Sequence, residues 1–195
     1  MIKIGILGNI GSGKSFVAKS FGYPVFDADY EVSKLYSKDK KVFKKLQKIL
    51  PNHFNEFPIE KNKVTQAILA NNSNLKKIVK IVHLEIRKKM NIFLKKNKKK
   101  RIVVLDIPLL LENKINKKND ILIFVQSNKS SINKKLRKRP YFNKILFKKF
   151  KKIQLPLDYK KKKSNFIIKN NFTKKSVKKE IKKILQKLNK WKKLY

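Results

Sequence analysis

The chain has 195 residues, 41 % of them hydrophobic, which is enough to form a folded core and excludes wholesale disorder. It contains no cysteine, which rules out a disulfide framework, a thiolate metal site and a thiol nucleophile. Its apolar start is short and interrupted by Lys3, and no later run approaches the ~18 apolar residues of a membrane helix. We therefore expect a soluble, cytoplasmic protein.

The net charge of +41 would ordinarily suggest a nucleic-acid partner. Only four of the 53 basic residues are arginines, however, and nucleic-acid readers rely on arginine for base edges and bidentate phosphate contacts. The favoured interpretation is a solvated lysine surface, with no specific nucleic acid and no membrane as partner. We expect a monomer or a weak homo-oligomer.

The first hundred residues contain two short strand patterns and a long helical region. Residues 2–7 form an apolar run typical of a buried parallel strand, and a helix is expected from Ser15 to Phe21. Residues 25–27 form the second strand pattern, and helical periodicity then continues to about residue 101. One long helix in this region has Ser73 as its expected N-cap. Its apolar stripe consists of Leu75, Ile78, Val79, Val82 and Ile86.

The second half of the chain alternates further strands with helices. Three short, β-branched runs predict strands: 102–107, 121–125 and 166–168. Residues 127–155 indicate two basic helices broken at Pro140, with Ser127 and Asn128 as candidate caps. An amphipathic helix is expected from near Thr173, with an apolar stripe of Val177, Ile181, Ile184, Leu185 and Leu188. Short apolar strands separated by helices predict an α/β fold around a parallel sheet.

A glycine-rich motif follows the first predicted strand and precedes the first predicted helix. Residues 8–15 match G-x-x-x-x-G-K-[ST] at every defined position. Glycine permits backbone angles that turn successive N–H groups toward phosphate oxygens. The lysine of this motif reaches the β- and γ-phosphates, and the hydroxyl of its last residue reaches Mg²⁺. We predict a nucleoside triphosphate site made of Gly8, Asn9, Ile10, Gly11, Ser12, Gly13, Lys14 and Ser15.

Acidic residues follow two of the predicted strands. Asp27 and Asp29 come at and after the end of the second strand, and Asp106 lies near the end of the third. Ligands of open parallel sheets bind beyond the carboxyl ends of the strands. A carboxylate there can hold Mg²⁺ through water, as expected for Asp106, or accept a proton from an attacking hydroxyl. A turn or helix cap is the alternative for each residue taken alone.

Two groups of cations are further candidates. His83 and Arg87 are four residues apart, so they share one helix face and can meet a substrate phosphate. Lys135, Arg137 and Arg139 follow the fourth strand, in a segment suited to a mobile lid that delivers cations to the migrating phosphoryl group. From spacing alone, an ordinary surface position is the favoured interpretation of His83 and Arg87. In so basic a chain, a charged helix face is the alternative for the other three residues.

With these motifs in order along nearly its whole length, the chain resembles the dephospho-coenzyme A kinase family. Ile4 to Ser15 looks like the family's I-G-L-T-G-G-I-G-S-G-K-S, and Asp27 to Asp29 is similar to its D-A-D. Asp106 to Glu112 resembles D-x-P-L-L-F-E, and Gln154 with residues 164–170 resembles Q…A-D-x-x-I-x-N. The D-A-D and P-L-L-x-E elements are more selective than the loop, which many enzymes share.

The resemblance implies a fold and a reaction. The fold is a P-loop kinase of the nucleoside-monophosphate-kinase type, with helices on both faces of a five-stranded parallel sheet. Residues 1–195 form a single domain with three subregions: a nucleotide-binding core of 1–29, 102–126 and 156–195, a helical substrate-binding insertion of 30–101, and a lid of 127–155. The implied reaction is ATP-dependent phosphorylation of the ribose 3′-hydroxyl of dephospho-coenzyme A, the last step of coenzyme A biosynthesis.

The resemblance also implies residue roles. Asp29 is the general base, and Lys14 and Ser15 hold Mg-ATP. Arg139 is the lid cation near the phosphates, while His83 and Arg87 align with the family's H-P-x-[IV]-R element near the substrate. The remaining contacts implied are Pro108 and Leu109 for the substrate, Asn170 for the nucleotide and Asp106 for the metal.

The chain departs from the family pattern at several positions. Leu7, Asn9, Leu84, Leu111 and Asn165 stand where the family has Thr, Gly, Pro, Phe and Asp. The lid pattern Q-x-x-R-x-x-x-R reads Ile132, Lys135 and Arg139, so one of its two arginines is kept. Lysine does not replace arginine at a bidentate phosphate contact, so different lid contacts are expected.

Two other functions stay open at this point. Another kinase of the same fold, acting on a nucleotide or a small metabolite, would share the phosphate-binding loop. A basic RNA-binding protein would account for the lysines, although the chain has no RNP-type aromatic motif and no zinc knuckle. A GTP switch is disfavoured because no N-K-x-D element is present.

Overall fold

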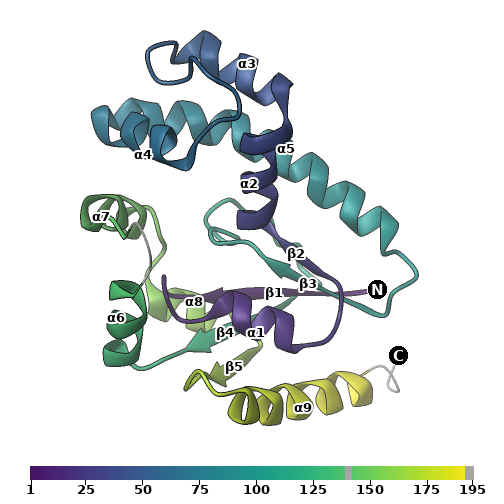
Figure 1. Cartoon of the computed structure of the whole chain (residues 1–195). Coiled ribbons are helices and arrows are strands. Elements are labelled where there is room, and N and C mark those ends of the chain that lie inside the picture. The colour runs from purple at the N-terminus through teal and green to yellow at the C-terminus, as the bar shows by residue number, and fades with distance from the viewer. Residues whose placement is uncertain (139–141, 192–195) are drawn as a thin grey trace. The chain divides into compact units, whose positions relative to one another are not determined.

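The computed structural model describes residues 1–138 and 142–191, with Trp191 described by its backbone alone. The chain forms two compact units, which Figure 1 shows as ribbons. The first unit contains residues 1–26, 97–142 and 151–195, and the second contains residues 27–96 and 143–150. Each unit is described by itself below.

A five-stranded sheet organises the first unit. Its strands are β1 (Ile2–Gly8), β2 (Val25–Asp27), β3 (Ile102–Asp106), β4 (Ile121–Gln126) and β5 (Phe166–Lys169). They lie in the order β2-β3-β1-β4-β5, and β1 is parallel to both β3 and β4, as β4 is to β5. All five strands fall where the sequence predicts them, which confirms the α/β class. Because β1 lies at the centre, its carboxyl end and the loop that follows are flanked by neighbouring strand ends.

Apolar helix faces cover the sheet. Helix α1 (Lys14–Ser20) and helix α9 (Lys174–Trp191) belong to one core cluster with the central strands. The predicted stripe of α9 is confirmed by Val177, Ile181, Ile184 and Leu188, each at most 5 % exposed. The three central strands β1, β3 and β4 are buried over almost their whole length, which is typical of parallel strands that are covered on both faces. Two further helices of this unit are α6 (Lys129–Arg137) and α8 (Leu157–Lys162).

The second unit is helical. It consists of α2 (Ala28–Lys38), α3 (Lys40–Ile49), α4 (Lys61–Ala70), α5 (Asn72–Lys96) and most of α7 (Lys144–Lys152). Burial of Ile78, Val82 and Ile86 confirms the predicted stripe of α5. The predicted cap of this helix is wrong, because α5 begins one residue before Ser73. The side chain of Asn71 accepts the Ser73 backbone N–H at 2.8 Å. Pro140, the predicted break between α6 and α7, lies outside the described residues.

A buried ion pair joins the segment after β3 to helix α8. Lys160 Nζ lies 2.6 Å from Glu112 Oε1, and the two side chains are 2 % and 8 % exposed. The same carboxylate oxygen accepts the Leu155 N–H at 3.0 Å. The other oxygen, Oε2, is buried with no hydrogen-bond partner among the described residues. Burying either charge without the other would be energetically costly. The ion pair therefore holds the P-L-L-x-E segment and helix α8 together.

Loss of one partner of this pair is expected to be far more harmful than loss of both. Glu112→Leu should lower the free energy of unfolding by about 3–5 kcal/mol, because it leaves Lys160 charged and buried. The double variant Glu112→Leu/Lys160→Met should recover most of that loss, since it leaves no buried charge. Urea unfolding of the three proteins measures the difference. Equal losses for the single and double variants would show that packing rather than charge is what matters.

Candidate phosphate-binding site

The loop between β1 and α1 has the backbone of a phosphate cradle. Gly8, Gly11 and Gly13 have φ angles of 148°, 82° and 85°, which side chains disfavour. Gly13 is the N-cap of α1 and supplies no side-chain cap, so the first N–H groups of the helix are left for another acceptor. Loops of this conformation turn backbone N–H groups toward a bound anion. The loop predicted from sequence therefore has the geometry that phosphate binding requires.

Close approach as well as conformation requires glycine at two of these positions. A Cβ at Gly8 would lie 2.7 Å from Ser12 Oγ and 2.8 Å from the backbone oxygen of Val125. A Cβ at Gly13 would collide with Asn170 Nδ2 and lie 3.0 Å from the ring of Phe172. The loop backbone therefore packs directly against the ends of β4 and β5. At these two contacts there is no room for a side chain on the loop.

Lys14 folds back over the loop. Its Nζ donates to the backbone oxygen of Asn9 at 2.8 Å and to that of Gly8 at 3.3 Å. This places an ammonium charge beside the same backbone segment that carries the inward N–H groups. The next residue, Ser15, is exposed in the first turn of α1. Cation, amides and hydroxyl together suit a polyphosphate chain, and the residues fit ATP.

Residues at the ends of β4 and β5 hold the loop in place. Asn170 is 3 % exposed, and its amide nitrogen donates to the backbone oxygen of Ser12 at 2.8 Å. Ser127, directly after β4, donates its hydroxyl to the same oxygen at 2.9 Å. The resemblance implies Asn170 as a nucleotide contact, and the sequence leaves both Ser127 and Asn128 as candidate helix caps. In the structure Asn128, not Ser127, caps α6, accepting the Ser130 N–H at 2.9 Å.

Helix α6 packs onto the loop through apolar side chains. A Cβ on Gly11 would lie 3.0 Å from Leu136 and 3.1 Å from Ile132, both of which are buried. Ile132, which replaces the family's glutamine, thus provides an apolar contact with the loop. Lys135 Nζ lies 5.2 Å from the centre of the Phe172 ring, a cation–π contact. Arg137 is exposed in the last turn of α6, and Arg139, the predicted lid cation, lies outside the described residues.

The segment after β3 runs beside the centre of the sheet. Asp106, the last residue of β3, is only 4 % exposed. Pro108 and Leu109 are partly exposed, whereas Leu110 is buried against Gly5 of β1, where an added Cβ would lie 2.7 Å from it. In the described residues, no three His, Asp or Glu side chains gather as a metal-binding group.

In the second unit, the two aspartates of the D-A-D element have different surroundings. Asp27 is the N-cap of α2, and its Oδ1 accepts the Tyr30 N–H at 3.0 Å. Asp29 lies in the first turn of that helix and is exposed. The cap that the sequence leaves open as an alternative therefore applies to Asp27.

His83 and Arg87 lie one turn apart on α5. Burial of the imidazole, and then the positive charge of Arg87, lower the pKa of His83 below 6.5. This coupling agrees with a shared helix face, and a neutral imidazole at pH 7 can accept or donate a hydrogen bond. Arg87 itself is exposed.

The lowered pKa predicts a pH effect on stability. As the pH falls below about 6.5, an unfolded histidine takes up its proton before folded His83 does, so the free energy of unfolding decreases. Urea unfolding at pH 7.5 and 5.5 should show a smaller decrease for His83→Gln than for the unchanged chain. An NMR titration of His83 with a midpoint at or above 6.5 would contradict the lowered pKa.

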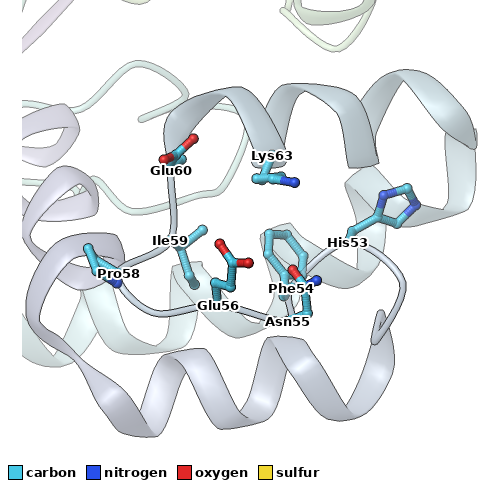
Figure 2. A pocket seen from close by; sticks show the side chains of 8 residues that line it. All are labelled: His53, Phe54, Asn55, Glu56, Pro58, Ile59, Glu60 and Lys63. Atoms are coloured by element: carbon cyan, nitrogen blue, oxygen red, sulfur yellow. The ribbon is translucent and has the colours of Figure 1, made fainter.

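The second unit also contains a small pocket, which Figure 2 shows between the loop after α3 and the first turn of α4. Its walls consist of His53, Phe54, Asn55, Glu56, Pro58, Ile59, Glu60 and Lys63. Because its walls carry two carboxylates and only one lysine, the pocket is less suited to bind a polyphosphate than the loop is.

Across the described residues, no helix is both long and apolar enough to cross a membrane.

The sheet order and the phosphate-binding loop define a P-loop kinase. A solved structure from Thermus thermophilus has the same fold, with a TM-score of 0.74 and 23 % identity over 96 % of this chain and 97 % of that one. A dephospho-CoA kinase from Campylobacter jejuni also superimposes, with a TM-score of 0.65 and 22 % identity over 97 % and 98 % of the two chains. At these identities the likeness shows the fold.

Sequence comparison identifies the family. The family model for dephospho-CoA kinase matches residues 2–176. A dephospho-CoA kinase of Wolbachia pipientis wMel is 34 % identical over 95 % of this chain and 97 % of its own length, and one from the Wolbachia of Brugia malayi is 32 % identical over the same shares. The chain belongs to the dephospho-CoA kinase family, as the resemblance predicted. Its activity is ATP-dependent phosphorylation of dephospho-CoA in coenzyme A biosynthesis.

Proposed function

We propose that residues 8–15 hold the phosphates of ATP while its γ-phosphoryl group passes to the ribose 3′-hydroxyl of dephospho-CoA. The observation that supports this most is the cradle itself. Three glycines have positive φ angles that residues with side chains rarely adopt, and the Lys14 ammonium lies 2.8 Å from a loop carbonyl oxygen. Phosphoryl transfer needs little covalent chemistry from the protein, so positioning and charge are the expected contributions.

Mg²⁺ is part of the proposal. The Ser15 hydroxyl would bind the ion directly, and Asp106 would hold it through water. Both are oxygen donors, which Mg²⁺ prefers, and one protein hydroxyl plus one carboxylate suits an ion that keeps several waters. When bound, the ion neutralises charge on the phosphates.

Asp29 is proposed as the general base. The 3′-oxygen forms a bond to the γ-phosphorus as the bond to the β–γ bridging oxygen breaks, and ADP leaves. The proton of the 3′-hydroxyl passes to the Asp29 carboxylate. Support comes from the family pattern and from the exposed position of Asp29 in the first turn of α2, where negative charge is favoured by the helix dipole.

The other predicted contacts complete the proposal. The two compact units suggest a division of labour in which the first binds ATP and the second contributes the substrate contacts His83 and Arg87. Pro108 and Leu109 are proposed to line the substrate site, and Arg139 to deliver the lid cation. We propose action as a monomer or weak homo-oligomer without a specific nucleic-acid partner, which light scattering after gel filtration would check.

A substrate panel tests the proposal. ADP release is measured with Mg-ATP and either dephospho-CoA or a nucleoside monophosphate as the acceptor. Phosphorylation at the 3′-hydroxyl should occur with dephospho-CoA, and ³¹P NMR of the product identifies the position. Turnover with nucleoside monophosphates alone would instead favour a different kinase of the same fold.

A further inference from the structure

The peptide that joins Ser12 to Gly13 is held by side chains from two distant parts of the chain. Its carbonyl oxygen accepts hydrogen bonds from Ser127 Oγ at 2.9 Å and from Asn170 Nδ2 at 2.8 Å. Ser12 is 1 % exposed and Asn170 is 3 % exposed, so this carbonyl is satisfied inside the protein rather than by bulk water. Two donors use both lone pairs of the oxygen and fix its direction.

Asn170 is itself held rigidly. Its backbone N–H donates to the Gln126 oxygen at 2.8 Å, continuing the alignment of β5 beside β4. Its side-chain oxygen accepts the Phe172 N–H at 2.8 Å. The amide is therefore oriented with its oxygen toward Phe172 and its nitrogen toward the loop, and Ser127 approaches the same carbonyl from the end of β4.

Because the peptide bond is planar, the direction of the Ser12 carbonyl also fixes the direction of the Gly13 N–H. In a trans peptide, C=O and N–H point in opposite directions across one plane. With the Ser12 carbonyl directed at Ser127 and Asn170, the Gly13 N–H must point the other way, to the opposite side of the loop. Rotation of this peptide by 180° would remove both hydrogen bonds and turn a carbonyl toward the side where anions bind.

We propose that Ser127 and Asn170 are positioning residues that set the Gly13 N–H as a preformed donor to the phosphates of ATP. The proposal rests on the proposed function of the loop and deepens it. Donors fixed before binding need no reorganisation during the reaction, which is why such groups contribute strongly. Neither side chain need touch the nucleotide for this role, so Asn170 acts here through the loop backbone.

Substitutions can separate this role from ordinary stabilisation. Asn170→Asp keeps an oxygen for the Phe172 N–H but replaces the donor to Ser12 by an acceptor, so it should repel the carbonyl. Ser127→Ala removes one donor, and Ser127→Thr keeps the hydroxyl and should restore function. The dissociation constant for ATP should rise about 3- to 10-fold for Ser127→Ala and at least about 30-fold for Asn170→Asp. The KM for dephospho-CoA should change little.

The chain offers matched controls in the same unit. Ser164 donates its hydroxyl to the Lys160 carbonyl at 2.8 Å, so Ser164→Ala removes the same kind of bond elsewhere. Asn165 Oδ1 accepts the Leu122 N–H at 2.8 Å, so Asn165→Asp adds the same charge while keeping that acceptor. Both controls should bind ATP as the unchanged chain does.

A spectroscopic measurement reads this peptide directly. Ser12–Gly13 is the one Ser-Gly pair in the sequence, so ¹³C-carbonyl serine with ¹⁵N-glycine gives a single HNCO signal, from this peptide. In the protein without nucleotide, the signal should shift in Ser127→Ala and Asn170→Asp and stay in place in both controls. Adding ATP should move the Gly13 amide proton in the unchanged chain.

The outcomes separate the two proposals. If the unchanged chain does not bind ATP, the proposed function fails and this inference fails with it. If the unchanged chain binds ATP while Ser127→Ala and Asn170→Asp bind it equally well, or leave the HNCO signal in place, the inference alone is overturned. Weaker ATP binding together with a shifted signal, in folded variants rescued by Ser127→Thr, supports it.

Discussion

Lys14→Met should lower kcat/KM for ATP by about 10²- to 10³-fold, because it removes the cationic donor that we propose contacts the phosphates. The Lys14 ammonium already lies over the loop, 2.8 Å from the Asn9 oxygen and 3.3 Å from that of Gly8. Methionine has a similar length and good helix propensity but carries no charge and no donor. The loss should therefore appear in ATP use and not in folding. Coupled detection of ADP with dephospho-CoA as acceptor measures it.

Lys19→Met is the matched control for this prediction. Lys19 lies on the same helix, in its last turn, and is exposed. The change removes the same charge and inserts the same side chain about 7.5 Å further along the helix axis, at about 1.5 Å per residue. Its kcat/KM should stay within about threefold of the unchanged chain, since an exposed charge at a helix end contributes little. Similar losses for both variants would mean that general charge, and not the position of Lys14, controls ATP binding.

Local patterns were enough to predict the sheet and the loop. Short and nearly continuous apolar runs predicted all five strands, because the signal for a buried parallel strand lies in its own residues and in the breaks that flank it. The loop motif specifies its conformation through its glycines. Gly11 and Gly13 have φ angles of 82° and 85°, which few other residues adopt. These features need no knowledge of distant contacts.

Contacts between distant residues could not be predicted in the same way. Ser127 and Asn170 reach the Ser12 carbonyl across 115 and 158 residues of sequence, and no spacing rule connects them. A serine after a strand is often a helix cap, so the sequence predicts a cap at Ser127 or Asn128 and gives no sign that the Ser127 hydroxyl contacts the loop. The partner of Glu112 was equally hidden, because Lys160 looks like any other lysine in a run of four.

Helix ends were predicted less well than helix interiors. The stripe of α5 is correct, yet its first turn is capped by Asn71 instead of Ser73, because two neighbouring polar side chains compete for the same N–H groups. Asp27 and Asp29 posed the same difficulty. Asp27 ends β2 and Asp29 comes two residues later, and only the hydrogen bond from the Tyr30 N–H to Asp27 separates the cap from the candidate base.

The second large effect is expected at Asp29, the candidate base. Asp29→Asn should lower kcat by about 10²- to 10⁴-fold, because an amide cannot accept the proton of the 3′-hydroxyl. The dissociation constant for ATP should stay close to that of the unchanged chain, since Asp29 is proposed to act on the acceptor and not on the nucleotide. Single-turnover phosphorylation of dephospho-CoA, with ATP binding measured by calorimetry, gives both quantities.

Asp27→Asn makes the same chemical change two residues earlier and separates base catalysis from the loss of negative charge at the start of α2. Asparagine is as good an N-cap as aspartate, so α2 should keep its first turn and kcat should stay near that of the unchanged chain. If a general charge effect on the helix were responsible, both variants would lose activity alike. Near-normal turnover in Asp29→Asn would remove Asp29 from the chemistry and leave transfer to depend on positioning alone. Turnover would then depend little on a general base, because in a loose transition state the attacking oxygen has formed little of its bond to phosphorus and its proton leaves only late.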